Sequence, residues 1–138
     1  MQPTLSYQIA RADRIISKQL TEILKAEGIS LPQYATLFLL KQKNNLSNSQ
    51  LAEKTFVKPQ SANKIIQELD DMGYIERHAD LIDKRKMLIN LTDSGNKKLL
   101  SCNNKVYNFE DKLLKNLDIN LINLIKSSLD VIVKEAQN

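Results

Sequence analysis

A short run in the middle of the chain carries the polar side chains that are best suited to contact base edges. Ala62, Ile65 and Ile66 have the spacing of the inner face of a helix, which leaves the polar residues around them on the outer face. These outer residues are Lys58, Gln60, Ser61, Asn63 and Lys64. Glutamine and asparagine amides pair bidentately with adenine, and lysine donates to guanine or to phosphate. Taken alone, a solvated face on an ordinary helix explains this run equally well.

The second half of the same predicted helix has the opposite charge. Its acidic residues, which phosphate would repel, are Glu68, Asp70 and Asp71. The charge therefore changes in the direction that is needed when the N-terminal end of a helix enters a DNA groove. An earlier helix start, Asn48-Ser49-Gln50, offers backbone N–H groups and the Ser49 hydroxyl to a phosphate.

A basic turn, Asp83-Lys84-Arg85-Lys86, follows further along the chain. Lys84, Arg85 and Lys86 are suited to reach flanking phosphates or a minor groove, and arginine is favoured where that groove is narrow. Asp83 is placed to pair with a neighbouring arginine and so to stiffen the turn. The usual explanation of such a turn is a solvated charge run. The helix and the turn together, in this order, are much more specific than either alone.

The apolar pattern predicts the elements that must hold these groups. Apolar residues recur every three or four positions from Leu5 to about Ala26, which predicts one long amphipathic helix that ends at Gly28. Ser30 and Gln33 form a capping-box pair that predicts the next helix start. That helix reaches about residue 42 and is apolar on most sides, so we expect it at the centre of the domain.

The next elements have similarly local signals. Ser47 and Gln50 predict a third helix start, and a fourth helix runs from Pro59 to about Met72 with Gly73 as its C-cap. Strands are predicted over 74–77 and 87–91, with a loop over 78–86 between them. Helices follow from residues 92 and 118. The predicted fold is mainly α with a small β-hairpin wing, in the order α-α-α-α-β-β-α-α, which is a winged helix-turn-helix.

Length and composition exclude several classes of protein. A chain of 138 residues is expected to form a single domain, and its net charge of +4 is compatible with a polyanionic partner. Cys102 is the only cysteine and His78 the only histidine, so we expect no disulfide, no cysteine-based metal site, no cofactor and no catalytic triad. Few aromatic residues disfavour a single-strand binder. No membrane span or signal peptide is evident, so a cytoplasmic protein is expected.

With these motifs in view, the chain resembles the MarR family of bacterial transcription regulators. The wing signature of that family, Asp-x-Arg followed by a strand and Leu-Thr, is matched by Asp83, Arg85, Leu91 and Thr92. The helix-turn-helix is similar through Leu51-Ala52-Glu53 and through Leu69 with Gly73-Tyr74-Ile75. Arg77 stands where the family has an arginine entering the wing, and it is expected to stabilise the wing together with Asp83.

The resemblance implies a function, partners and a division of the chain. It implies a repressor that binds double-stranded DNA at a pseudo-palindromic operator as a homodimer. Residues 1–138 would form one MarR-like domain, with residues 30–92 as the DNA-binding part and residues 1–29 and 93–138 as the dimerisation region. The long apolar faces of the terminal helices independently favour an interface. The alternative is that these helices fold back on their own chain.

The resemblance also implies a small aromatic or other effector, for which Tyr7, Tyr34 and Phe38 are candidate lining residues; core packing is the alternative role. Family members that sense oxidants have a cysteine in the first helix, whereas Cys102 lies in the fifth, so a structural thiol is expected. The chain departs from the family pattern at Phe56, which stands where a glycine is frequent, at Lys58, which stands at a capping position, and in the apolar Leu81-Ile82 tip.

The sequence therefore predicts a DNA-binding regulator that is not an enzyme. A winged-helix module that binds other proteins without specific DNA binding is the alternative hypothesis, and the basic helix start and basic wing argue against it. A hydrolase that uses Cys102 or His78 is disfavoured, because no third partner of a triad is identifiable.

Overall fold

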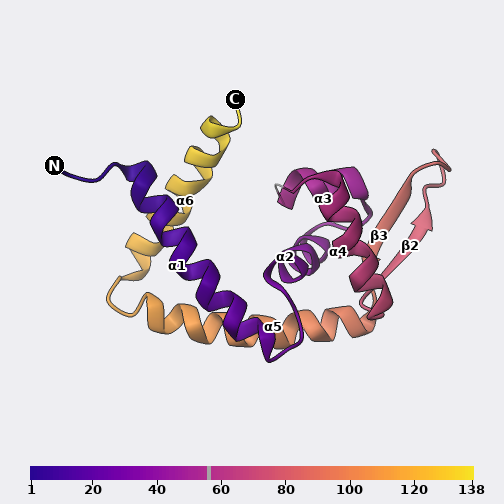
Figure 1. Ribbon diagram of the computed structural model, residues 1–138, viewed down its shortest axis with the longest axis horizontal. Helices are drawn as coiled ribbons and strands as arrows, with labels where there is room; N and C mark the ends of the chain where they lie inside the picture. The colour runs from indigo at the N-terminus through magenta and orange to yellow at the C-terminus, as the bar shows by residue number, and fades with distance from the viewer. Residues whose placement is uncertain (56) are drawn as a thin grey trace. The chain divides into compact units, whose positions relative to one another are not determined.

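The computed structural model describes residues 1–55 and 57–138 (Figure 1). Phe56, which the sequence singled out in the turn, lies outside the described residues. The chain divides into two compact units, residues 1–105 and 106–138. The elements in chain order are α1 (Leu5–Lys25), α2 (Leu31–Gln42), β1 (Leu46–Ser47), α3 (Asn48–Thr55), α4 (Pro59–Asp71), β2 (Ile75–Ala79), β3 (Met87–Leu91), α5 (Asp93–Leu113) and α6 (Ile119–Ala136). The mainly helical fold with a β-hairpin wing is confirmed.

The helices begin where the capping pattern predicts. The Ser30 hydroxyl accepts from the backbone N–H of Gln33 at 3.2 Å, and the Gln33 side chain accepts from the Ser30 N–H at 2.9 Å. Ser47 and Gln50 make the same reciprocal pair before α3, at 3.2 and 2.9 Å. Each pair satisfies two N–H groups that a helix start would otherwise leave unbonded. Gly73 follows α4 with φ +79°, a conformation that glycine adopts without steric cost.

The small sheet has one strand more than the sequence predicted. Its order is β1-β3-β2, with Leu46 opposite Ile89 in one antiparallel pair and Arg77 opposite Ile89 in the other. β1 has only two residues, too few to show an alternating pattern, and it exists because β3 supplies its hydrogen-bonding partners. The predicted strand over 74–77 and loop over 78–86 are corrected as well: β2 begins at Ile75 and extends through His78 to Ala79.

The core of the first unit lies around α2, as predicted. Leu37 and Leu40 of this helix are at most 1% exposed. Fully buried leucines and isoleucines from other elements of the unit surround this core: Leu24, Leu46, Leu51, Leu69, Ile89 and Leu99. This packing sets the positions of α3, α4 and β3, and thus of every side chain in the candidate site.

The start of α5 is fixed against the chain that enters the wing. The Thr92 hydroxyl donates to the Gly73 carbonyl at 2.6 Å and accepts from the Gly95 N–H at 3.0 Å. A Cβ on Gly95 would lie 2.0 Å from the Tyr74 carbonyl oxygen, so only glycine allows this approach. The predicted Thr92 helix start is thereby confirmed.

The second unit contains the end of α5 and all of α6. Asp118 caps α6 by accepting the Leu121 N–H at 3.1 Å, as the sequence predicted. None of the residues of α6 is buried in the single chain. Its exposed apolar residues include Leu121, Leu124, Ile125, Leu129 and Ile132. In the described part of the chain, no helix is long and apolar enough to cross a membrane.

Candidate nucleic-acid interface

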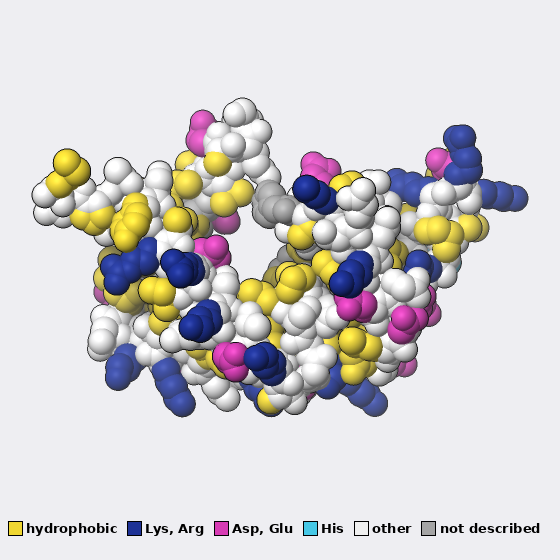
Figure 2. All heavy atoms as spheres, in the orientation of Figure 1, with side chains coloured by type: hydrophobic (Ala, Val, Ile, Leu, Met, Phe, Trp, Pro, Cys, Tyr) yellow, Lys and Arg dark blue, Asp and Glu magenta, His cyan; other side chains and the backbone are white. Residues whose placement is uncertain are grey.

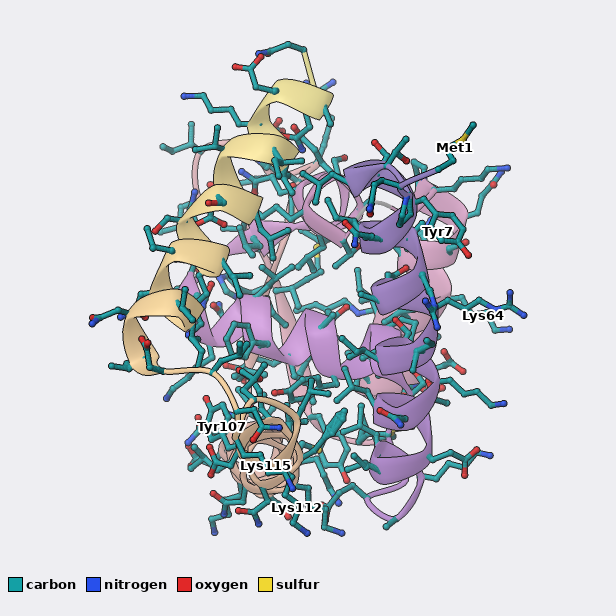
Figure 3. The ribbon with its side chains drawn as sticks, turned by 90° about the vertical axis from the view of Figure 1, so that its left-hand side faces the viewer. Met1, Tyr7, Lys64, Tyr107, Lys112 and Lys115 are labelled. Carbon is teal, nitrogen blue, oxygen red and sulfur yellow. The ribbon has the colours of Figure 1, made fainter. Side chains whose placement is uncertain are left out.

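The N-terminal half of α4 presents its predicted polar residues to solvent. Ala62, Ile66 and Leu69 are at most 3% exposed, because they form the inner face of the helix. The residues predicted to read DNA are all exposed: Lys58, Gln60, Ser61, Asn63 and Lys64. The Lys64 side chain extends away from the ribbon (Figure 3). This half of α4 therefore offers amide, hydroxyl and ammonium groups on one accessible face.

The start of α3 adds groups suited to an anion. Ser49 is exposed in the first turn of α3, at the end where helical N–H groups lack intrahelical acceptors. The Ser47 capping box uses one of these N–H groups, that of Gln50. The Asn48 amide oxygen is buried and has no hydrogen-bond donor among the described residues.

The wing turn is held by its two aspartates. The backbone N–H of Asp80 donates to the Lys86 carbonyl at 2.8 Å, and the Lys86 N–H donates to the Asp83 carbonyl at 2.9 Å. The Asp83 carboxylate accepts the Arg85 N–H at 3.1 Å and lies 3.5 Å from the Arg85 Nε. Arg85 keeps its side chain 95% exposed. Lys and Arg side chains gather at the outer end of the hairpin (Figure 2).

Arg77 connects the wing to the acidic half of α4. Its guanidinium lies 2.8 Å from the Asp70 carboxylate and donates to the Gln67 amide oxygen, also at 2.8 Å. A second nitrogen, Nε, donates to the same Asp70 oxygen at 3.1 Å. This planar, multiply bonded contact fixes the middle of β2 against the second half of α4. Asp70, which would repel phosphate, is thereby paired with a cation.

A cleft of about 810 Å³ joins these elements. Five of the residues predicted to contact DNA or to stabilise the wing line this cleft: Ser49, Arg77, Asp83, Arg85 and Lys86. From α4 only Ile66 is in its lining, so the exposed polar residues of α4 lie outside the cleft. The structure thus brings the α3 start and the wing together at one hollow, while the exposed polar face of α4 lies outside it.

The three candidate effector residues occupy different settings. The Tyr34 hydroxyl donates to the Asn103 amide oxygen of α5, and the Tyr34 and Phe38 ring centroids are 6.3 Å apart. Tyr7 lies in the first turn of α1 and is 59% exposed (Figure 3). Tyr34 therefore contacts α5, Phe38 lies beside Tyr34, and a shared role with Tyr7 stays a prediction.

Cys102 and His78 have no catalytic setting. Cys102 is fully buried, and this burial, followed by the nearby Glu27 carboxylate, raises the pKa of its thiol. A buried thiol with a raised pKa is a poor nucleophile. His78 is exposed on β2 opposite Leu88, at the entrance to the wing. Among the described residues, no group of histidine, cysteine and acidic side chains could hold a metal ion.

An ion-pair cluster that no sequence pattern predicted holds α5 to the turn after α1. Glu27 lies 3.0 Å from the Lys105 ammonium and 3.4 Å from that of Lys98, and it accepts from the Ser101 hydroxyl at 2.8 Å. The bond from Lys105, followed by that from Ser101, lowers the pKa of Glu27 to about 2. These partners are more than 70 residues away along the chain, beyond the reach of any local pattern.

Known proteins resemble the chain in sequence. A family model described as MarR family matches residues 29–87. The HTH-type transcriptional repressor Rv2887 of Mycobacterium tuberculosis is 30% identical over 91 residues, which are 66% of this chain and 66% of that protein. The match therefore leaves about a third of that relative uncovered. The uncharacterized HTH-type transcriptional regulator YwoH of Bacillus subtilis is 28% identical over 110 residues, 80% of each chain.

Solved structures share the fold. The transcriptional repressor CouR, bound to a 23-mer DNA duplex, has a TM-score of 0.85 and 21% identity and covers 94% of this chain and 92% of that one. Rv2887 of Mycobacterium tuberculosis in complex with salicylic acid has a TM-score of 0.76 and 24% identity, covering 95% of this chain and 97% of that one. The likeness to both structures extends over nearly the whole chain and is one of fold.

Proposed function

The chain belongs to the MarR family, and we propose that it is a transcriptional repressor that binds a pseudo-palindromic operator in double-stranded DNA as a homodimer. The observation that carries the proposal is the exposed polar face at the start of α4, together with a wing that has three exposed cations. A helix fits the major groove and donates to base edges, while wing cations contact phosphate or the adjacent minor groove. The comparison with CouR, a repressor bound to duplex DNA, supports this reading.

The residues divide the work between base reading and phosphate contact. Gln60 and Asn63 are the candidates for bidentate contact with adenine, and Ser61 accepts or donates according to the base. The phosphate-contacting candidates are Ser49, Lys58, Lys64, Lys84, Arg85 and Lys86. Asp83 and Arg77 position the wing by the bonds described above.

The homodimer follows from the apolar surface that a single copy leaves exposed. The large hydrophobic residues Leu124 and Ile125 of α6 are 63% and 46% exposed. Exposed apolar surface of this kind on a single chain marks an interface with another molecule. We assign residues 1–29 and 93–138 to dimerisation and residues 30–92 to DNA binding. A closed two-fold dimer then presents two α4 helices to two half-sites of the operator.

We also propose a small effector, a cytoplasmic location and the absence of enzymatic activity. A small aromatic effector is supported by the complex of Rv2887 with salicylic acid, and Tyr7, Tyr34 and Phe38 remain its candidate contacts. The protein acts in the cytoplasm and is not an enzyme; the curated relatives are transcriptional regulators, and Cys102 is buried away from any substrate. Exposed cations at both the helix start and the wing favour a polyanion such as DNA over a module that only binds other proteins.

Selection of DNA from a pool of randomised duplexes tests the function. The wild-type protein is mixed with the pool at moderate salt, and the bound duplexes are sequenced after several rounds. The proposal predicts enrichment of an inverted repeat whose half-sites are about one helical turn apart. Enrichment of no sequence, or of a single half-site without symmetry, would contradict the proposed dimeric operator binding.

A further inference from the structure

The tip of the wing carries two large apolar side chains that the mechanism above does not use. Leu81 and Ile82 are 95% and 96% exposed, the highest values after the N-terminal Met1 among the large hydrophobic residues that the structure describes. Single exposed apolar residues are common on protein surfaces. Two adjacent ones at the end of a charged hairpin form a small apolar patch that could contact a partner.

The turn fixes these side chains in their exposed position. The Asp80 carboxylate accepts the Ile82 N–H at 3.0 Å, and the Asp80 N–H is bonded to the Lys86 carbonyl at 2.8 Å. Asp83 makes the corresponding side-chain bond to the Arg85 N–H. Both aspartate carboxylates therefore accept backbone N–H groups of the turn. This hydrogen-bonded loop holds Leu81 and Ile82 facing outward.

The charge beside the tip indicates the partner. Lys84, Arg85 and Lys86 follow Ile82 within the same turn and are all exposed. The negative charges of Asp80 and Asp83 are held by backbone N–H groups and, for Asp83, by Arg85. An apolar pair bordered by cations is complementary to the minor groove of duplex DNA, where apolar side chains can insert between the faces of neighbouring bases while cations contact the phosphates of the walls.

The position of the tip agrees with that partner. Arg77 ties β2 to Asp70 and Gln67 of α4, so the hairpin keeps its direction relative to the recognition helix. From Arg77 to Leu81 the chain spans at most about 13 Å, at about 3.3 Å per extended residue. The minor groove is about 7.5 Å deep, so the hairpin beyond Arg77 is long enough for its tip to reach the floor of the groove.

We propose that Leu81 and Ile82 enter the minor groove beside each half-site and wedge against a base step, so that the operator is bent where the wing contacts it. The inference rests on the proposed function, because it requires that α4 and the wing bind duplex DNA. Apolar wedges unstack and kink base steps, and pyrimidine–purine steps kink most easily. The wing thereby favours operators whose DNA kinks easily at the contacted step, and so contributes to sequence specificity.

The test uses a duplex selected by the wild-type protein from a randomised pool. 2-Aminopurine is placed at successive positions beside each half-site, and its fluorescence reports unstacking; dyes at the two ends report bending by energy transfer. The variants are the double substitution Leu81→Ala with Ile82→Ala and the conservative Leu81→Ile with Ile82→Leu. Met72→Ala is the matched control, since Met72 is an exposed apolar residue (42%) at the C-terminal end of α4.

We expect the double alanine variant to bind at least about tenfold more weakly and to lose the fluorescence increase and the bend, with an unchanged salt slope, because no phosphate contact is removed. The conservative variant and Met72→Ala should behave as wild type. Binding and bending by the double alanine variant equal to those of wild type would overturn the wedge alone. An altered sedimentation coefficient with unchanged DNA binding would also overturn it, since the tip would then contact a second copy. Absence of duplex binding by wild type would overturn the proposed function as well.

Discussion

Individual side chains at the interface have separable roles, because amides read bases and cations read phosphate. Asn63 lies on the exposed face of α4 and Lys84 in the wing turn. Asn63→Ala should cost about 1–3 kcal/mol at the preferred operator and relax the base preference at one position of each half-site. Lys84→Ala should weaken binding to all sequences alike and lower the salt slope by about 1 per protomer.

Competition binding with a panel of single-base operator variants, repeated at several salt concentrations, measures both effects. Gln67→Ala, at an exposed position in the second half of α4, is not a suitable control because Gln67 holds Arg77. Lys54→Ala, an exposed cation at the end of α3, is preferable. Unchanged base preference in Asn63→Ala would remove that residue from the reading set.

Glu27 makes the stability of the fold sensitive to acid. Its pKa is lowered from the ordinary value of 4.5 to about 2, first by Lys105 and then by Ser101. The carboxylate therefore stabilises the folded state above about pH 4.5, and this contribution is lost as the pH falls toward 2. Glu27→Gln should reduce the free energy of unfolding by roughly 2–3 kcal/mol at pH 7 and by about half of that at pH 3.

Urea denaturation of both proteins at the same concentration, at pH 7 and pH 3, measures the difference. Glu22→Gln is the control, since Glu22 is an exposed residue of α1 whose partner is the neighbouring Lys25. A difference between wild type and Glu27→Gln that does not shrink on acidification would show that the Lys98, Ser101 and Lys105 contacts do not depend on the charge of Glu27.

Among the structural elements, α4 begins with a charged residue that does not stabilise the helix start. Lys58 is its N-cap residue, and its side chain makes no capping hydrogen bond. Lys58→Ser should raise the free energy of unfolding by about 0.5–1 kcal/mol, because serine accepts an otherwise unbonded N–H. The same change removes a cation from the DNA-contacting end, so it should weaken DNA binding.

Thermal unfolding and DNA titration of one preparation measure the two effects together. Lys58→Arg, which keeps the charge without adding a cap, serves as the control. A variant that is more stable and binds DNA as tightly as wild type would mean that the Lys58 ammonium does not contact the operator.

Elements with local signals were predictable from the sequence, and elements defined by distant partners were not. Three capping residues indicate a helix start, because each can accept the backbone N–H three residues further on. All three caps are confirmed: Ser30, Ser47 and Asp118. β1 depends on pairing with β3, and the Glu27 cluster depends on α5, so neither leaves a local pattern. The exposed residues of the candidate site were likewise predictable from helix periodicity, while the contact of Arg77 with Asp70 was not.

At the scale of the whole molecule, the apolar face of α6 calls for a second copy. Leu124 is 63% exposed in the single chain. A charged side chain at this position would oppose the burial of this helix face at a dimer interface. Leu124→Asp should therefore shift the protein from dimer to monomer and weaken operator binding, because one α4 helix then binds without the help of the other. Sedimentation velocity and DNA titration measure the two effects.

Lys126→Asp, two residues away on the same helix, introduces the same acidic side chain at an exposed polar position and should remain dimeric. A Leu124→Asp protein that stays a dimer at low micromolar concentration would place the interface elsewhere. Circular dichroism of the soluble fraction distinguishes a Leu124→Asp protein that has dissociated into folded monomers from one that has lost its solubility.

The most direct test of the account is the salt dependence of binding to a selected operator, for wild type and for Arg85→Ala. The affinity of wild type should fall steeply and linearly with salt on a double-logarithmic plot, because bound phosphates release counterions. Arg85→Ala should bind at least about tenfold more weakly, with a shallower slope. A flat response of wild type, or an Arg85→Ala protein with wild-type affinity and slope, would contradict the assignment of this wing to DNA.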